Sequence, residues 1–232
     1  MPSSNSIPDL DSNLSRAMDN RSPAESSISE SNYDRTAKIT AALKEWAIVC
    51  KALEEGRQVL LLRKGGIMEY KEGFQVKHNS FLLYPTFEHQ SLESIQLDYA
   101  HNLTAMLQEE RDYNKVRITS YARVIAVKQI EDGSLLSQLQ KYHVWNERYV
   151  RVRMNYNPKK PMQVVLLRVY RLQDPIEVEV NSEWLGCRSW LDIQVFVSQS
   201  GLAHKQVSFG DQPVIDDSLF DRIASEIEKI LR

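Results

Sequence analysis

The pattern of apolar and polar residues changes at Thr36, and from there it predicts short helices and strands in irregular alternation. We expect a helix over Ala37–Trp46, followed by strands over Trp46–Ala52 and Gln58–Arg63. The intervening Glu54–Arg57 segment contains a glycine and is typical of a turn. The two strands are therefore predicted to form a hairpin.

The next part of the chain contains signals for both element types. Short strands are expected at Phe74–Val76 and Phe81–Tyr84, the second ended by Pro85. Apolar residues at helical spacing predict one helix over Leu92–Glu110, and alternation over Lys115–Ile130 predicts a long strand.

The second half of the chain continues the mixture. Further strands are predicted at Gln163–Leu172, Ile176–Val180 and Trp190–Ser198. Further helices are predicted at Leu135–Tyr142 and Ser218–Leu231, the last with a capping box formed by Ser218 and Asp221. Tyr149–Met154 fits either element: strand alternation would place Arg151 and Arg153 on one face, but the apolar spacing favours a helix.

These elements do not follow the regular βαβ rhythm of a parallel sheet. The predicted class is therefore α+β, with a strongly bent or barrel-like mixed sheet flanked by helices in one domain over residues 36–232. Residues 1–35 differ, since they contain ten serines, three prolines and six acids against three arginines. This composition is typical of a disordered acidic tail, or of an arm that folds onto a basic surface.

Composition excludes several classes of protein. Of the 232 residues, 42% are hydrophobic, which is ordinary for a globular chain. Two cysteines exclude a disulfide scaffold, and apolar runs such as Val59–Leu62 are too short to cross a membrane. With no secretory signal pattern at the start, we expect a cytoplasmic protein without a membrane association.

Familiar catalytic and cofactor motifs are absent from the sequence. It has no phosphate-binding GxxxxGK[ST] loop, no dinucleotide GxGxxG turn, no GxSxG elbow and no zinc spacing among its five histidines, so no cofactor and no metal are expected. Glu69-Tyr70-Lys71 contains half of a nuclease metal motif, but its glycine-flanked position favours a solvated turn. Cys187 is expected to be a small buried residue rather than a nucleophile.

One segment, His143–Arg171, is strongly basic within a chain of net charge −2. Its only acid is Glu147, and its seven basic residues are Arg148, Arg151, Arg153, Lys159, Lys160, Arg168 and Arg171. Its interleaved aromatic residues are Trp145, Tyr149, Tyr156 and Tyr170. Guanidinium groups pair with phosphate and aromatic faces stack on bases, so the segment is typical of a surface for nucleic acid or a phosphorylated ligand. A solvated rim neutralised by Glu177, Glu179 and Glu183 is the competing interpretation.

Within this segment, Arg168 is predicted to lie on a core-facing side of a strand, where its charge needs a partner. In a strand over Gln163–Leu172 it shares a face with Val164 and Leu166, so it is aligned with core residues. An unpaired buried charge is costly, and we expect Arg168 near the accessible end of the strand, bound to a partner or a ligand.

Several strings together carry a family resemblance. They are LKEWAIVCKALEEGRQVLLLRKGGI from Leu43, FLLYPTFEHQ from Phe81, HVW from His143, PKKPMQVVLLRVYRL from Pro158 and GCRSW from Gly186. Over residues 43–195 the chain resembles the uncharacterised, largely cyanobacterial family called domain of unknown function 1802. Some members of that family are fused to a restriction-endonuclease-type domain, so the resemblance implies a nucleic-acid setting, restriction–modification and a nuclease-type partner protein, but no cleavage by this chain. No activity is established for the family.

The resemblance and the basic segment together define candidate site residues. A binding module for DNA, RNA or a phosphorylated small molecule would use Arg63, Lys64, Trp145, Arg151, Arg153, Lys159, Lys160, Arg168 and Tyr170. Two alternatives remain open. One is a phosphoesterase or nuclease-like enzyme using Glu88, His89 and His143 as acid–base groups, and the other is a protein-interaction scaffold. The binding module, which is not an enzyme, is favoured.

Overall fold

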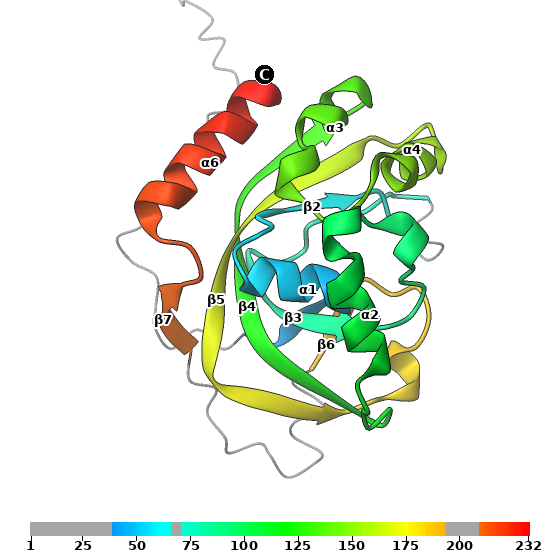
Figure 1. Cartoon of the computed structure of the whole chain (residues 1–232), viewed down its shortest axis with the longest axis vertical. Helices are drawn as coiled ribbons and strands as arrows, with labels where there is room; N and C mark the ends of the chain where they lie inside the picture. Colours follow the sequence, from blue (N-terminus) through cyan, green and yellow to red (C-terminus); the bar gives the residue numbers. More distant parts are fainter. Residues whose placement is uncertain (1–38, 66–70, 194–208) are drawn as a thin grey trace, which may run out of the picture. The chain divides into compact units, whose positions relative to one another are not determined.

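A curled sheet of seven strands organises the part of the chain that the structure describes, residues 39–65, 71–193 and 209–232 of a computed structural model (Figure 1). The strand order is β2-β5-β4-β3-β1-β6, and β7 pairs with β5. Among the strands of the described residues, β1 and β3 are the one parallel pair. The strands are β1 Ala41–Trp46, β2 Leu60–Arg63, β3 Ser80–Thr86, β4 Lys115–Ile130, β5 Met162–Glu179, β6 Trp190–Asp192 and β7 Phe209–Pro213.

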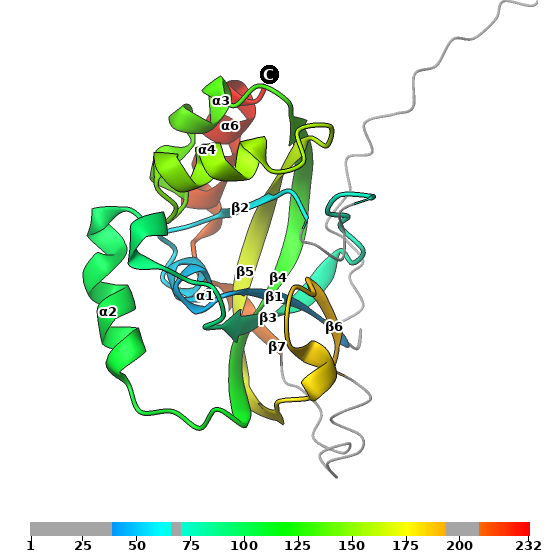
Figure 2. The ribbon, with the colours of Figure 1, turned by 90° about the vertical axis from the view of Figure 1, so that its right-hand side faces the viewer.

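Helices lie on both sides of this sheet. In the turned view, α3 and α4 lie at one end of the sheet, while α2 lies beside α1 (Figure 2). The α-helices are α1 Ala47–Glu54, α2 Ala100–Gln108, α3 Ser134–Gln138, α4 Glu147–Asn155 and α6 Asp217–Ile230. The described part of the chain also contains the 3₁₀ turns η3 Leu92–Ser94, η4 Leu97–Tyr99, η5 Gln140–Tyr142 and η6 Ser182–Trp184. The α+β class and the bent mixed sheet flanked by helices are confirmed.

One ion pair measures how far the sheet curls. Arg63 Nη1 on β2 lies 2.7 Å from Glu45 Oε2 on β1, although three strands separate β2 from β1 in the sheet order. In a flat sheet these strands would lie about 19 Å apart, given the spacing of about 4.8 Å between neighbours. The long strands β4 and β5 produce the bend, because their pairing shifts register at Ile118/Ser120 and Val124/Ala126.

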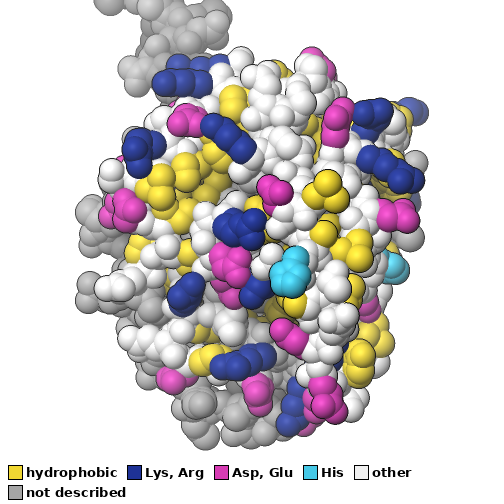
Figure 3. All heavy atoms as spheres, viewed as in Figure 1, with side chains coloured by type: hydrophobic (Ala, Val, Ile, Leu, Met, Phe, Trp, Pro, Cys, Tyr) yellow, Lys and Arg dark blue, Asp and Glu magenta, His cyan; other side chains and the backbone are white. Residues whose placement is uncertain are grey.

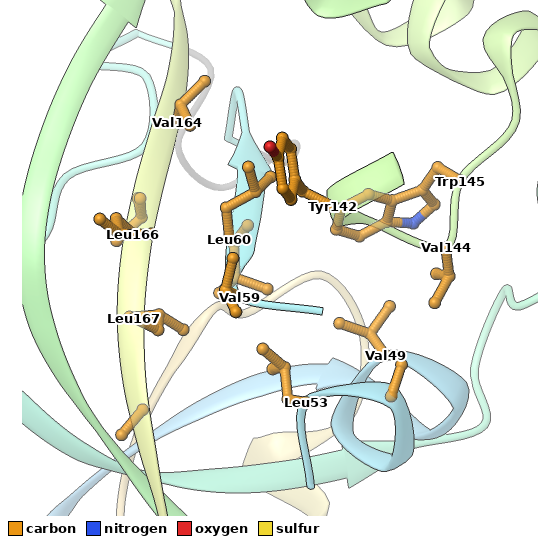
Figure 4. Packing of buried hydrophobic residues seen from close by; sticks show 14 of the residues in the cluster. Val49, Leu53, Val59, Leu60, Tyr142, Val144, Trp145, Val164, Leu166 and Leu167 are labelled. Atoms are coloured by element: carbon orange, nitrogen blue, oxygen red, sulfur yellow. The ribbon is translucent and has the colours of Figure 1, made fainter. Parts of the chain in front are cut away.

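The core fills the inside of the curl. Helix α1 buries six of its eight residues there, among them Val49 and Leu53. Figure 4 shows Val144 and Trp145 meeting α1 from one side and Leu167 of β5 from the other. The segment that carries Val144 is fixed by Gln58, whose Oε1 accepts the Val144 N–H at 3.0 Å. Apolar burial in this cluster is the main stabilising contribution to the fold.

The first two elements are of the opposite types to those predicted from the sequence. Ala41–Trp46 is a strand and Ala47–Glu54 is a helix, so the predicted hairpin does not form, and β2 pairs with β5 instead. Strand β1 lies between β3 and β6 with both faces buried, and tertiary pairing there overrides the helix propensity of its alanines and leucine. Helix α1 is buried almost all round, so its sequence lacks the polar face that marks a surface helix. Gly56, at φ 71°, follows it in the predicted turn.

Two predicted elements in the middle of the chain were also wrong. Phe74–Val76 forms no strand of the sheet, and the Gln75 carbonyl accepts the indole N–H of Trp190 instead. The single helix predicted over Leu92–Glu110 is divided into η3, η4 and α2. Ile95 forms an isolated bridge with Trp145, and the Gln96 N–H donates to the Val144 carbonyl at 2.8 Å, so the backbone cannot stay helical there.

The remaining long elements were predicted well. The strand over Lys115–Ile130 is β4, and the favoured helix at Tyr149–Met154 lies within α4. The two strands predicted on either side of Pro175 are one strand, β5, because Pro175 lies where the pairing with β4 is irregular and no N–H is needed. The final helix begins with Asp216, rather than Ser218, as its cap. The strand predicted at Trp190–Ser198 is β6 up to Asp192, and its residues 194–198 lie outside the described residues, as do residues 1–35.

Candidate nucleic-acid interface

A cleft of about 360 Å³, here called the aromatic cleft, opens where several strand ends meet α4. Its walls come from the end of β1, the end of β2, the turn after β3, one face of α4 and the 186–189 loop. The lining residues that the argument uses are Lys44, Glu45, Trp46, Arg63, Glu88, His89, Trp145, Tyr149, Arg153 and Arg188. The curl of the sheet creates the cleft, since it brings β1 and β2 together.

Two ion pairs build the floor of the aromatic cleft. Lys44, 8% exposed, places Nζ 2.7 Å from Glu88 Oε2 and also donates to the carbonyls of Trp184 and Gly186. Glu45, 6% exposed, pairs with Arg63, which donates its other terminal nitrogen to the Ser189 hydroxyl at 2.7 Å. These groups satisfy one another, so they hold the 184–189 loop and the β3 turn in place.

Aromatic rings form one wall of the aromatic cleft. Trp46 and Tyr149 have ring centroids 5.1 Å apart, and Tyr149 stacks on Trp145 at 6.1 Å with an interplanar angle of 15°. Trp145 is buried, whereas Trp46 and Tyr149 are half-buried and offer ring surface to the cleft. Burial raises the pKa of the Tyr149 phenol, which therefore stays protonated and able to donate a hydrogen bond.

The remaining cations of the aromatic cleft are not matched by acids. Arg153 donates to the Gly65 carbonyl at 2.8 Å, and Arg188 is exposed on its loop. Among the residues that the structure describes, neither forms a salt bridge with a carboxylate. Four Lys or Arg side chains thus face two carboxylates in this cleft. On the face that Figure 3 draws, Lys and Arg side chains are interspersed with Asp and Glu side chains, over α4 as elsewhere.

A second cleft, of about 680 Å³, lies on the other side of α4 and is here called the lysine cleft. Its cationic residues are Lys64, Arg151, Lys159 and Lys160, and its acids are Glu131 and Glu147. Arg151 pairs with Glu147 on the exposed side of α4 at 2.8 Å. Lys64, 3% exposed, donates to the Met154 carbonyl at the end of α4. Burial, and secondarily the nearby charge of Arg153, lower the pKa of Lys64.

The sequence-predicted binding residues are therefore divided between two clefts. Arg63, Trp145 and Arg153 line the aromatic cleft, and Lys64, Arg151, Lys159 and Lys160 line the lysine cleft. Arg168 and Tyr170 lie in neither. The expectation that Arg168 lies near an accessible strand end was wrong. It is mid-strand, 5% exposed, paired with Asp217 and stacked over Phe220 of α6.

Tyr170 has packing partners away from both clefts. Its ring stacks on Tyr121 at 4.9 Å, and the Arg123 guanidinium lies 4.9 Å from its centroid. Cross-strand pairing of β4 with β5 produces this arrangement, since Tyr121 and Tyr170 are register partners. The two aromatic rings stabilise the sheet there.

The three residues of the enzyme alternative do not share a cleft. Glu88 and His89 line the aromatic cleft, where His89 has a positive φ of 62°. His143 is fully buried, packs on Trp145 at 5.6 Å and lines neither of the two clefts. Burial lowers the pKa of His143 to about 4, so it is neutral at pH 7.

The sequence also raised Cys187 and the Glu69-Tyr70-Lys71 triplet as possible chemical groups. The expectation that Cys187 is buried was wrong, because it is exposed on the loop that lines the aromatic cleft, while Cys50 is buried. Glu69 and Tyr70 of the nuclease-like triplet lie outside the described residues. Within residues 39–65, 71–193 and 209–232, no group of three or more His, Cys, Asp or Glu side chains is placed to hold a metal. In the same ranges, no helix has the length and apolar character that crossing a membrane requires.

Sequence reasoning missed four residues of the aromatic cleft, namely Lys44, Glu45, Trp46 and Arg188. A signal for the first two existed. Two adjacent charges stand in an otherwise apolar stretch, which is unusual for a buried strand unless the charges are paired. Trp46 and Arg188 stand in the strings LKEW and GCRSW but carry no local pattern that distinguishes them from packing and surface residues.

Most of the chain matches one protein family. The model of the family described as Domain of unknown function (DUF1802) matches residues 42–226, and the chain belongs to this family. The match includes both clefts and α4. No curated protein matches the chain.

Some solved structures show a distant likeness. ASCH from Zymomonas mobilis is 15% identical with a TM-score of 0.40, and the likeness covers 75% of this chain and 98% of that one. A serine-to-alanine mutant of that protein gives 12% identity and a TM-score of 0.41, covering 70% and 94% of the respective chains. A tyrosine-to-phenylalanine mutant gives 13% and 0.40, covering 72% and 98%.

Proposed function

We propose that this domain is a non-catalytic binding module for nucleic acid and that the aromatic cleft is its binding site. One observation carries the proposal: ring surface from Trp46 and Tyr149 lines the same cleft as Arg153 and Arg188, which lack carboxylate partners among the described residues. Bases stack on aromatic faces, and guanidinium groups pair with phosphate oxygens. An unstacked base against Tyr149 would leave its phosphate within reach of the cleft's cations.

The buried ion pairs support this reading of the aromatic cleft. Lys44 and Glu88, and likewise Arg63 and Glu45, neutralise each other on the floor. The charge left for a ligand is therefore the unmatched charge of the rim, which is positive. This positive charge attracts any anionic ligand, and the rings add base stacking, which favours nucleic acid over an acidic protein.

Fluorescence anisotropy with labelled single-stranded RNA, single-stranded DNA and duplex DNA tests the proposal at two salt concentrations. We expect binding to a single strand that weakens as salt rises, because displaced counterions contribute to the affinity. Tyr149→Leu removes the ring and should weaken binding by about 5- to 150-fold, the equivalent of roughly 1–3 kcal/mol per stacked base. Tyr149→Phe keeps the ring and is the matched control.

The charge contribution has its own matched pair. Arg188→Glu reverses an exposed charge in the aromatic cleft, and Arg222→Glu reverses an exposed charge on α6. The first should weaken binding by about tenfold and reduce the salt dependence, and the second should leave both unchanged. The proposal fails if the wild type binds none of the three nucleic acids at low salt, or if Tyr149→Leu and Arg188→Glu both bind as the wild type does.

A further inference from the structure

The lysine cleft differs from the aromatic cleft in the chemistry of its lining. No aromatic residue lines it, and its polar lining combines three lysines and Arg151 with serines and the acids Glu131 and Glu147, of which Glu147 is paired with Arg151. A site without rings has nothing on which a base can stack. Its cations suit it to a ligand's phosphates.

The lysines are held in place by the backbone around them. Lys160 donates its N–H to the Asn157 carbonyl at 3.0 Å in a turn flanked by Pro158 and Pro161. Its aliphatic stem passes Gly73, where an added Cβ would lie 3.7 Å from it. Lys159 in the same turn is exposed. Among the described residues, neither lysine forms a salt bridge, so no described carboxylate neutralises these two lysines of the cleft lining.

Lys64 adds a buried cation to the same cleft. It is 3% exposed, and its ammonium donates to the Met154 carbonyl. A helix C-terminus favours a cation, which is the structural role of this contact. The nearby Arg153 guanidinium is a like charge, and burial together with that charge lowers the pKa of Lys64. An anion in the cleft would stabilise both cations.

The two clefts meet at the end of β2. Lys64 lines the lysine cleft, while its neighbours Arg63 and Gly65 line the aromatic cleft. Arg153 donates to the Gly65 carbonyl, and Lys64 donates to the carbonyl of Met154, the residue after Arg153. The C-terminal turn of α4 and the end of β2 thus lie between the two clefts and are here called the ridge, with an excess of cationic lining residues on each side.

We infer that the lysine cleft is a phosphate-binding site for the backbone of a single strand whose base occupies the aromatic cleft. This inference rests on the proposed function and adds a ligand class: a single-stranded oligonucleotide several residues long, passing over the ridge. A mononucleotide fills the aromatic cleft alone. Longer strands gain affinity from phosphates in the lysine cleft, and a duplex cannot enter, because its bases stay stacked in the helix.

The experiment is a length series with DNA and RNA arms. A mononucleotide, a dinucleotide, a tetramer and an octamer are titrated into the full chain by calorimetry at several salt concentrations. Lys159→Ala with Lys160→Ala removes the two free lysines, and Lys115→Ala with Lys128→Ala removes two exposed lysines of β4 as the matched control.

The lysine-cleft variant should leave mononucleotide affinity within about twofold of the wild type. It should reduce the octamer's affinity roughly tenfold or more and its logarithmic salt slope by about 1.4, the value for two lost phosphate contacts on a single strand. The β4 variant should change neither. Equal affinity of wild type for mononucleotide and octamer, or an octamer unaffected by the lysine-cleft variant, overturns the inference.

Failure of the inference is distinguishable from failure of the proposed function. If the octamer binds and Tyr149→Leu abolishes that binding while the lysine-cleft variant has no effect, the aromatic cleft is the whole site and only the inference falls. If no length binds the wild type, both fall. If the mononucleotide binds as tightly as every longer strand, the ligand is a phosphorylated small molecule and the strand-binding inference is refuted.

Discussion

His143 packs against Trp145, which lines the aromatic cleft. The burial of the His143 ring predicts how the stability of the protein depends on pH. The ring is fully buried, and burial lowers its pKa from 6.5 to about 4. In the unfolded chain His143 takes up a proton as the pH falls through about 6.5, while in the folded protein it stays neutral until about pH 4. The unfolded state therefore binds more protons in this range, and stability must rise with pH across it.

The magnitude follows from the difference between the two pKa values. Each unit corresponds to about 1.36 kcal/mol, so the free energy of unfolding should fall by about 3 kcal/mol as the pH drops from about 6.5 to about 4 because of this residue. Above pH 6.5 the contribution is constant, because the ring is neutral in both states. Carboxylates add their own slope below pH 5, so the measurement must compare two proteins.

The comparison is urea unfolding of the wild type and His143→Gln at pH values from about 7.5 down to about 4.5. The variant carries no titrating ring, so the difference in unfolding free energy between the two proteins should change by about 1.4 kcal/mol per pH unit below pH 6.5. A constant offset from repacking does not affect this slope. If the difference is independent of pH, His143 is accessible to protons in the folded protein, and the placement of its ring in the core is refuted.

Three further outcomes are expected. Arg63→Met leaves Glu45 buried without its partner, so it should lower the free energy of unfolding by about 3 kcal/mol or more, and adding Glu45→Gln should recover part of that loss, both measured by urea unfolding. Asn146 caps α4, because its Oδ1 accepts the Tyr149 N–H, so Asn146→Ala should lower the free energy of unfolding by about 1–2 kcal/mol, measured by thermal unfolding. A smaller loss of stability for Asn146→Ala than for Asn146→Asp would contradict the capping role. Arg168→Met removes the contact with Phe220 while Asp217, 90% exposed, stays hydrated, so stability should fall by about 1 kcal/mol and oligonucleotide affinity should not change.

The sequence predicted the type and extent of an element best where one face of that element is buried and the other is exposed to solvent. Strand β4 and helix α6 have such faces, and their extents follow the apolar pattern closely. Strand β1 and helix α1 are buried almost all round, so no pattern distinguishes their types, and propensity favoured the wrong one. What decides them is the pairing of β1 with β3 and β6, which involves residues far along the chain.

The candidate site divides in the same way. The basic composition of His143–Arg171 identified Arg153 and the lysines of the 157–160 turn, because the charge of a segment can be read directly from its sequence. Arg168 belongs to the same basic segment but faces α6. The strand pattern predicted that Arg168 is buried, but it did not identify Asp217 as its partner. Trp46 and Arg188 are brought to α4 by the curl of the sheet, a long-range effect that local spacing does not encode.

The most direct test of the central claim is cross-linking that reports which residues touch a base. A single-stranded octamer containing one 4-thiouridine is bound to the full chain, irradiated and digested, and the linked peptides are identified by mass spectrometry. The account predicts cross-links to peptides that contain Trp46 or Tyr149, lost when unlabelled octamer is added in excess. Cross-links confined to α6 or to the outer face of β4 and β5, with none in either cleft, would contradict it.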